Sequence, residues 1–191
     1  MARSIIAPGA GDGLRRIVGE IVREMPAASH CLDLGCGPHS WLTDHGLGPV
    51  GLDISAAYVE AHSASGAPGV VASAAHLPFA DCTFDAVWSI GLYHHLPDDL
   101  TRNSLLEAER VCRPGGYLAV VDAVLPERPL SQPLAYGIRM LDRGRFMRRR
   151  DHLTALLPGR RDWHLRRHTI SVVGIEVLSC VTVVSDTPAS Q

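Results

Sequence analysis

Lysine is absent from this sequence, in which all 18 basic residues are arginine, and we attribute that absence to a compositional bias. No run of 18 apolar residues occurs and the N-terminus lacks an apolar segment, which disfavours a membrane-spanning helix and a secretion signal. The five cysteines are odd in number and contain no Cys-x-x-Cys pair. They predict reduced thiols rather than a disulfide framework, and with them a cytoplasmic location.

Aromatic residues are few and the charges nearly balance, which together disfavour nucleic acid as a partner. Aromatic residues make up 5% of the chain, the formal net charge is −2, and the isoelectric point is about 6.5. Arginine is nevertheless concentrated late in the chain: residues 1–136 carry a net charge of −7, and residues 137–191 carry +5. Such asymmetry is typical of a solvated charged surface and also of an anion-binding face, so both interpretations stay open.

Short apolar runs alternate with helical patterns, which predicts an α/β fold with a parallel sheet. The length of 191 residues and a hydrophobic share of 46% favour one domain spanning residues 1–191. We expect strands near 30–34, 49–53, 69–72, 85–90, 116–122, 164–171 and 177–184. We expect helices from about Asp12 to Pro26 and near 39–45, 55–64, 98–112, 134–141 and 150–157. The last two strands are too close for a crossover helix, so at least one should run antiparallel.

The most informative stretch is residues 31–37, which read Cys-Leu-Asp-Leu-Gly-Cys-Gly. An apolar run that ends in glycines indicates a buried strand turning tightly into a helix, where a ligand can approach the main chain. A second apolar run ends in Asp53, sixteen residues after Gly37. A carboxylate there can accept hydrogen bonds from a ribose diol, or can cap the helix that begins near Ser55. We prefer the first interpretation, which predicts a nucleoside-containing cofactor.

The dinucleotide fingerprint requires a third glycine, which the stretch from Gly35 to Ser40 lacks. A nicotinamide-dependent oxidoreductase is therefore a disfavoured alternative. The form Asp33-x-Gly35-x-Gly37 instead resembles the first motif of class I S-adenosylmethionine-dependent methyltransferases. Three later stretches resemble motifs of that family in the same order, namely Leu-Pro-Phe-Ala-Asp-Cys-Thr-Phe-Asp at 77–85, the strand and His-Leu loop at 86–98, and Val-Cys-Arg-Pro-Gly-Gly-Tyr-Leu at 111–118.

The resemblance covers about half of the chain and implies a Rossmann-like fold. It implies a seven-stranded, mostly parallel sheet with an antiparallel last strand and helices on both faces. The implied activity is transfer of a methyl group from S-adenosyl-L-methionine to an oxygen, nitrogen or carbon atom of a small molecule, with S-adenosyl-L-homocysteine as product. Two alternatives are a non-catalytic or regulatory protein that binds S-adenosylmethionine, and an RNA methyltransferase.

The cofactor-binding residues implied by the resemblance follow the ends of the early strands. Gly35 and Gly37 would pass under the methionine moiety, and Asp33 would fix this loop or hold the amino group through water. Ser73 stands where the family often has an aspartate that binds adenine, so its uncharged hydroxyl predicts a weaker contact. The full predicted set is Asp33, Gly35, Cys36, Gly37, Asp53, Ile54, Ser73, Ala74 and Ile90.

The candidate catalytic residues are Tyr93, His94 and His95 after the fourth strand, and Asp122 at the end of the fifth. His95 matches the family's His-Leu position and would act as a general base, or would only pack the loop. Asp122 would pair with such a histidine or with a substrate hydroxyl, or would cap the following loop.

We interpret residues 123–147 as a cap over the substrate, because an insertion after a parallel strand leaves at the ligand-binding end of the sheet. The N-terminal helix would form a second wall, and residues 1–11 and 186–191 would be flexible. Within the cap, Arg143 and Arg145 could bind a carboxylate or phosphate on the substrate. No metal is expected, since His164 and His168 would lie about 13 Å apart on a strand.

Overall fold

Strands and helices alternate along most of the chain in the computed structural model, which describes residues 9–25, 30–127, 130, 132–141, 144–159 and 161–185. The helices are α1 (Ala10–Glu24), α2 (Ala56–Ser63), α3 (Asp98–Val111), α4 (Pro133–Leu141) and α5 (Arg150–Leu156), with short 3-10 turns η1 (Thr43–His45) and η2 (Tyr93–His95). The strands are β1 (Cys31–Leu34), β2 (Val50–Asp53), β3 (Gly69–Val71), β4 (Phe84–Ile90), β5 (Cys112–Val124), β6 (His164–Thr169) and β7 (Glu176–Val183).

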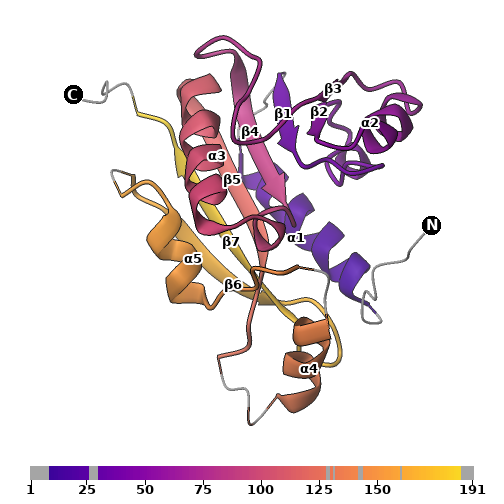
Figure 1. The fold of residues 1–191 in the computed structure, drawn as a ribbon, viewed down its shortest axis with the longest axis vertical. Helices are drawn as coiled ribbons and strands as arrows, with labels where there is room; N and C mark the ends of the chain where they lie inside the picture. Colours follow the sequence, from indigo (N-terminus) through magenta and orange to yellow (C-terminus); the bar gives the residue numbers. More distant parts are fainter. Residues whose placement is uncertain are drawn as a thin grey trace.

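The seven strands form one sheet in the order β3-β2-β1-β4-β5-β7-β6 (Figure 1). β1 to β5 pair in parallel, whereas β7 runs antiparallel to both of its neighbours, β5 and β6. The predicted fold class is therefore confirmed, including the antiparallel last strand. The edge strands are β3, of three residues, and β6, which carries His164, Arg166 and His168.

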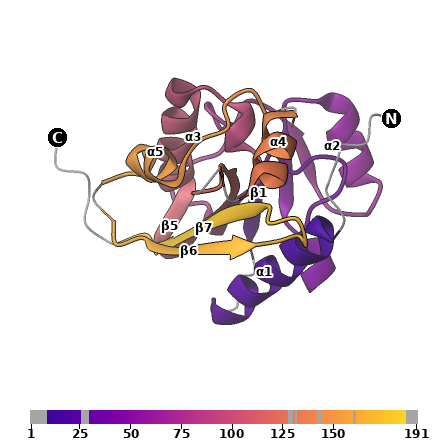
Figure 2. The same cartoon turned by 90° about the horizontal axis from the view of Figure 1, so that it is seen from below.

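Helices cover both faces of the sheet, and apolar side chains fill the space on each side. On one face, Ile17, Val18 and Ile21 of α1 pack with Trp88 of β4 and Val121 of β5. On the other face, α3 and α5 pack against β4, β5 and β7. Figure 2 shows α1 below the sheet and α3 and α5 above it. The helical stripe predicted in the N-terminal segment thus faces the core.

The predicted helix at 39–45 is wrong, because only Thr43–His45 form a single 3-10 turn. Local side-chain bonds compete with a helix here: the Ser40 hydroxyl bonds Asp33, and the Thr43 hydroxyl donates to the Ser40 carbonyl at 2.6 Å. Flexibility of residues 1–11 stays a prediction, and within that stretch α1 begins at Ala10, which is 4% exposed. Residues 1–8 and 186–191 lie outside the described residues.

The carboxyl ends of β1, β2, β4 and β5 meet along one end of the sheet, which we call the carboxyl edge. α4 lies at this edge, where Arg139 donates a hydrogen bond to the Glu176 carbonyl at 2.6 Å (Figure 1). β5 continues to Val124, so the segment predicted as a cap begins two residues later than expected. α1 also begins at this edge, because a Cβ on Gly13 would lie 2.4 Å from the Ile170 carbonyl oxygen. That these segments cover a substrate stays a prediction.

None of the described helices has the length and apolar character that crossing a bilayer requires.

Candidate active site

The glycine turn after β1 brings main chain and ligand space together at the carboxyl edge. Gly35 and Gly37 have φ of +69° and +61°, which favour glycine. The amides of Gly35 and Cys36 both donate to the Leu52 carbonyl, at 2.7 and 3.1 Å, so the turn is fixed to the end of β2. A Cβ on Gly35 would lie 2.8 Å from Leu92 Cδ1, whereas a Cβ on Gly37 would meet nothing within 4 Å. Open space therefore adjoins the turn at Gly37.

Asp53 links this turn to the start of α2. Its carboxylate accepts hydrogen bonds from the amide of Gly37 at 3.2 Å and from the amide of Ser55 at 2.9 Å. The carboxylate thus binds the amide of the N-cap residue of α2 and also faces the glycine turn, and its role toward a ribose stays a prediction. Each oxygen retains a second lone pair that a ligand hydroxyl could use.

A pocket lies beside Asp53, and we call it the Asp53 pocket. Five of the nine predicted cofactor residues line it: Gly35, Asp53, Ile54, Ser73 and Ala74. Its other lining residues are apolar, and the sequence analysis did not select them: Leu52, Ala72, Ala75, Leu92, Leu96 and Leu100. Leu92 and Leu96 flank η2, so the pocket borders the turn that carries the two candidate histidines. The apolar residues supply flat contact surface, with Asp53 as the polar anchor.

Asp33 lies behind the glycine turn and is 2% exposed. Its Oδ2 accepts a hydrogen bond from the Ser40 hydroxyl at 2.5 Å, whereas its buried Oδ1 has no hydrogen-bond partner. Burial raises the pKa of this carboxyl to about 7, against the Ser40 bond, which lowers it, and with a further contribution from the charge of Asp53. A cationic group near Oδ1 would satisfy the orphaned oxygen.

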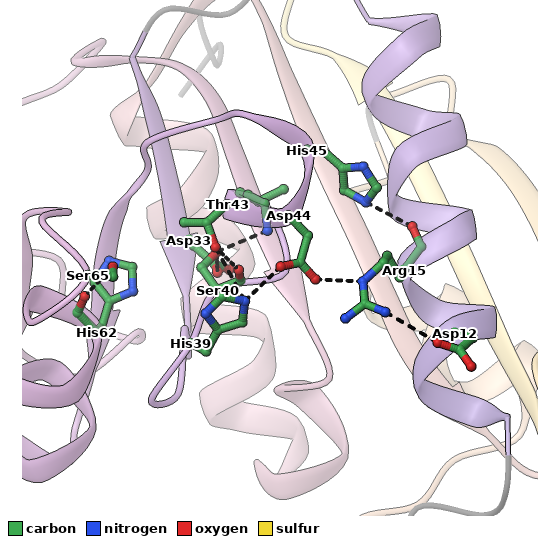
Figure 3. A network of polar contacts seen from close by, with 11 residues as sticks. Asp12, Arg15, Asp33, His39, Ser40, Thr43, Asp44, His45, His62 and Ser65 are labelled. Atoms are coloured by element: carbon green, nitrogen blue, oxygen red, sulfur yellow. Dashed lines mark hydrogen bonds and ion pairs between the residues drawn. The ribbon is translucent and has the colours of Figure 1, made fainter.

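The loop after the glycine turn is also tied to α1 through a chain of ion pairs (Figure 3). His39 contacts Asp44 at 2.9 Å, and Asp44 accepts from Arg15 of α1 at 2.8 Å. His45 contacts the Arg15 carbonyl at 2.9 Å. α1 therefore holds the loop that carries Ser40, the hydrogen-bond partner of Asp33.

Two predicted cofactor residues point away from the Asp53 pocket. Cys36 is buried, its thiol contacts the Gly37 carbonyl at 3.4 Å, and burial raises its pKa to about 12. Its sulfur lies behind β2, 2.7 Å from where a Cβ on Gly51 would stand. Ile90 is 7% exposed and belongs to the core that α1 covers. The side chains of Cys36 and Ile90 therefore pack inside the protein, and only the main-chain atoms of these residues could reach a ligand in the Asp53 pocket.

His94 and Asp122 form a buried pair at the carboxyl edge. His94 Nδ1 lies 2.6 Å from Asp122 Oδ1, and the two side chains are 11% and 1% exposed. Burial opposes ionisation of Asp122, but the charge and hydrogen bond of His94, with the amides of Ala123 and Tyr93, hold the pKa of its carboxyl below the ordinary value. Nδ1 is thus the ring nitrogen that faces Asp122, and Nε2 is the second titratable nitrogen of the same imidazole.

The other members of the predicted catalytic group have different positions. His95, for which the sequence left open a role as base or in packing the loop, is exposed, and its ring lies tilted against that of His94 with centroids 4.0 Å apart. Of the two histidines, His94 is the one that contacts Asp122 on β5, and a catalytic role for His95 stays a prediction. Tyr93 is 1% exposed and packs between β5 and α5, and burial raises the pKa of its hydroxyl to about 12. Its side chain does not reach the edge.

Arg143 lies outside the described residues, so its predicted substrate contact stays untested. Arg145 is exposed, in the stretch between α4 and α5. Among the residues that the structure describes, no three His, Cys, Asp or Glu side chains gather into a group that could hold a metal ion. His168 instead contacts the Ser179 hydroxyl at 2.8 Å.

Comparison with known proteins addresses what this site binds. Residues 32–120 match the family described as "Methyltransferase domain". This stretch is a class I S-adenosylmethionine-dependent methyltransferase domain. It contains the glycine turn, Asp53, the Asp53 pocket and His94, and it ends within β5. The resemblance found in the sequence is therefore confirmed, as is the cofactor class.

Relatives of the methyltransferase domain act on different substrates. The chain is 36% identical over 132 residues to 27-O-demethylrifamycin SV methyltransferase of Amycolatopsis mediterranei, which covers 62% of this chain and 48% of that protein. It is 34% identical over 108 residues to tRNA (carboxymethyluridine(34)-5-O)-methyltransferase of Arabidopsis thaliana, covering 54% and 26%. The matched stretch thus spans less than half of either relative. The solved structure of YcgJ from Bacillus subtilis has the same fold, with a TM-score of 0.72 at 15% identity over 92% of this chain and 100% of that one.

The residues present in the methyltransferase domain fit the cofactor. The orphaned, buried Oδ1 of Asp33 suits an ammonium group, and the carboxylate of Asp53 suits a ribose diol. Ser73 stands where the family commonly has an acidic residue. Its hydroxyl accepts a hydrogen bond from the Ala75 amide at 3.2 Å. Adenine would therefore depend more on the apolar lining of the Asp53 pocket than on a charged contact.

Proposed function

We propose that this protein methylates an oxygen, nitrogen or carbon atom of a small molecule, with His94 as the proton acceptor. The observation that carries the proposal is the Asp122–His94 pair at the carboxyl edge, in which His94 belongs to η2, the turn flanked by Leu92 and Leu96 of the Asp53 pocket. When bound, S-adenosylmethionine supplies a methyl group on a positively charged sulfur, which a nucleophile displaces in line. The acceptor must also lose a proton, and this chain has a group suited to take it.

Asp53 in the pocket and Asp33 behind the glycine turn would hold the two polar parts of the cofactor. Asp53 would accept hydrogen bonds from the ribose hydroxyls, and Asp33 would face the amino group directly or through water. Leu92 and Leu96 would pack on the adenosine and connect it to η2. Such positioning contributes most of the rate, because a correctly aligned nucleophile avoids up to about 7–11 kcal/mol of entropic and solvent cost.

His94 would then remove the acceptor's proton through Nε2. Asp122 fixes the Nδ1 proton of the imidazole and stabilises the imidazolium that forms. The acceptor atom would pass its proton to Nε2 of His94 as it takes up the methyl group that the bound cofactor would supply. A buried carboxylate makes this transfer easier, because it offsets the new charge in a low-dielectric site.

Ion pairs formed by three arginines near the C-terminal end favour a small acceptor over RNA. Arg161 pairs with Glu109, Arg166 with Glu24, and Arg167 with Glu176 and Glu127. These guanidinium groups serve the fold and are engaged rather than available for phosphates. The exposed large side chains of α4 at the carboxyl edge are instead apolar: Leu134, Met140 and Leu141. The rifamycin-modifying relative supports the same conclusion.

Label transfer tests this proposal. The purified protein is incubated with S-adenosylmethionine carrying a tritiated methyl group, together with the small-molecule or the RNA fraction of a cell extract. We expect label in the small-molecule fraction with the native protein and strongly reduced label with His94→Ala. Label in RNA would contradict the substrate class. Binding of S-adenosylhomocysteine in calorimetry without transfer to either fraction would favour a non-catalytic binding protein.

A further inference from the structure

The stretch from Gly144 to Arg148, which we call the returning segment, leads from α4 to α5 and lies against η2. The Phe146 amide donates a hydrogen bond to the His94 carbonyl at 3.0 Å. Gly144 lies over the same residue so closely that a Cβ would stand 2.3 Å from His94 Cδ2 and 2.8 Å from its carbonyl oxygen. The segment therefore contacts both the main chain and the ring of His94.

Arg148 fastens the same turn from the other side. Its side chain is 4% exposed and donates hydrogen bonds to the Tyr93 and Leu96 carbonyls, each at 2.6 Å. It also donates to Asp98 at 2.9 Å, and Asp98 in turn contacts His152 of α5 at 2.7 Å. Hydrogen bonds from Arg148 and His152 lower the pKa of Asp98, so this carboxylate balances the buried guanidinium. One side chain thus joins both ends of η2 to the first turn of α3.

The main chain of Arg148 is fixed to the strand that carries Asp122. Arg148 forms a parallel bridge with Val124, and its carbonyl accepts from the Leu125 amide at 2.9 Å. Asp122 stands two residues before Val124 on β5. The same residue therefore holds β5 through its backbone and η2 through its guanidinium, the two elements that bring Asp122 and His94 together.

We propose that Arg148 is a positioning residue that acts through His94, by holding η2 against β5 so that His94 Nδ1 faces Asp122. This proposal deepens the proposed function, since it rests on His94 as proton acceptor. Arginine suits the task because its planar fork reaches two carbonyls and a carboxylate at once, which the single ammonium of lysine cannot do. Titratable groups near His94 include Asp122 on β5 and His95 in η2, with Asp98 and His152 beyond Arg148.

Nuclear magnetic resonance of the histidine rings tests the proposal without an acceptor. In the native protein, full length and free of ligand, we expect the proton on His94 Nδ1 to resonate far downfield and to exchange slowly with water. In Arg148→Met this signal should exchange at least about tenfold faster, the factor for losing about 1.4 kcal/mol of hydrogen bonding. Arg148→Lys should recover only part of the protection. The matched control is Arg149→Met, which removes the exposed neighbouring guanidinium.

Arg148→Lys keeps the proposal testable if Arg148→Met fails to fold, and a variant at Gly144 tests how the returning segment packs on His94. Gly144→Ala leaves Arg148 intact but places a methyl group against the His94 ring, so it should also expose the Nδ1 proton. Gly137→Ala is its control, since a Cβ there meets nothing within 4 Å. Native-like protection in a folded Arg148→Met, or in Arg148→Lys where Arg148→Met does not fold, would overturn the role of Arg148. The label-transfer result would be unaffected, so the two proposals fail separately.

Discussion

Ionisation of Asp33 should make the ligand-free protein less stable as the pH rises from 5 to 8. The carboxyl is 2% exposed, one of its oxygens has no partner, and burial raises its pKa to about 7 from an ordinary value of 3.8. Between these two values the folded state holds a proton that the unfolded state has lost. Stability from this group is therefore complete below about pH 4 and is lost as the pH rises through 7.

The magnitude follows from the two pKa values. A change from 3.8 to about 7 corresponds to about 4 kcal/mol, because each pKa unit is worth about 1.4 kcal/mol. About 2–3 kcal/mol of that loss falls between pH 5 and pH 8. Asp33→Asn cannot ionise and can still accept the hydrogen bond from Ser40. Relative to the native protein, this variant should therefore gain about 2–3 kcal/mol between pH 5 and pH 8.

Urea unfolding of both proteins at several pH values measures the effect, and the comparison cancels all other titrating groups. Asp99→Asn, which removes an exposed carboxyl, is the control and should show no such trend. If the unfolding free energies of Asp33→Asn and the native protein stay parallel from pH 5 to pH 8, the reasoning from burial is refuted. Asp33→Asn should also bind S-adenosylhomocysteine more weakly in calorimetry, because the amide cannot pair with the amino group.

Three further predictions concern the site and its support. His94→Ala should slow methyl transfer to the identified acceptor by about 10²–10⁴-fold, whereas His95→Ala should cost less than about tenfold; equal losses would contradict the assignment. Asp53→Ala should weaken S-adenosylhomocysteine binding about ten- to hundredfold in calorimetry, the value of one charge-assisted hydrogen bond; an unchanged Kd would assign the ribose to other residues. Gly51→Ala should destabilise the protein by about 1–3 kcal/mol in urea unfolding, because the new Cβ would lie 2.5 Å from His62. His62→Ala in the same chain should recover part of that loss, because the contact with Cys36 Sγ at 2.7 Å remains, and no recovery would contradict a clash with His62.

The sheet could be predicted because its signals are local. Each parallel strand is a short apolar run bounded by turn residues, and all seven predicted strands overlap observed ones. The predicted secondary structure is wrong where side chains compete with the backbone for hydrogen bonds. The hydroxyls of Ser40 and Thr43 form hydrogen bonds with neighbouring groups, and these bonds limit η1 to a single turn. The spacing of apolar residues in the sequence does not indicate such bonds.

The candidate site was predictable in part for the same reason. Asp53 and the glycine turn follow strand ends, which a sequence reveals, and both border one pocket. The identity of the buried histidine depends on the rotation of a three-residue turn, and adjacent histidines look alike in a sequence. Arg148 lies about fifty residues from the carbonyls it binds, so no local pattern connects them.

The two edges of the sheet are both poor templates for another chain. β3 offers only three residues, and β6 presents His164 and Arg166 to solvent along its length. Short and charged edges resist the addition of a foreign strand, which is the first step toward fibrillar aggregation. The antiparallel hairpin of β6 and β7 therefore does more than complete the sheet. It covers β5, which would otherwise be a long apolar edge strand, and its own outer strand, β6, carries charged residues.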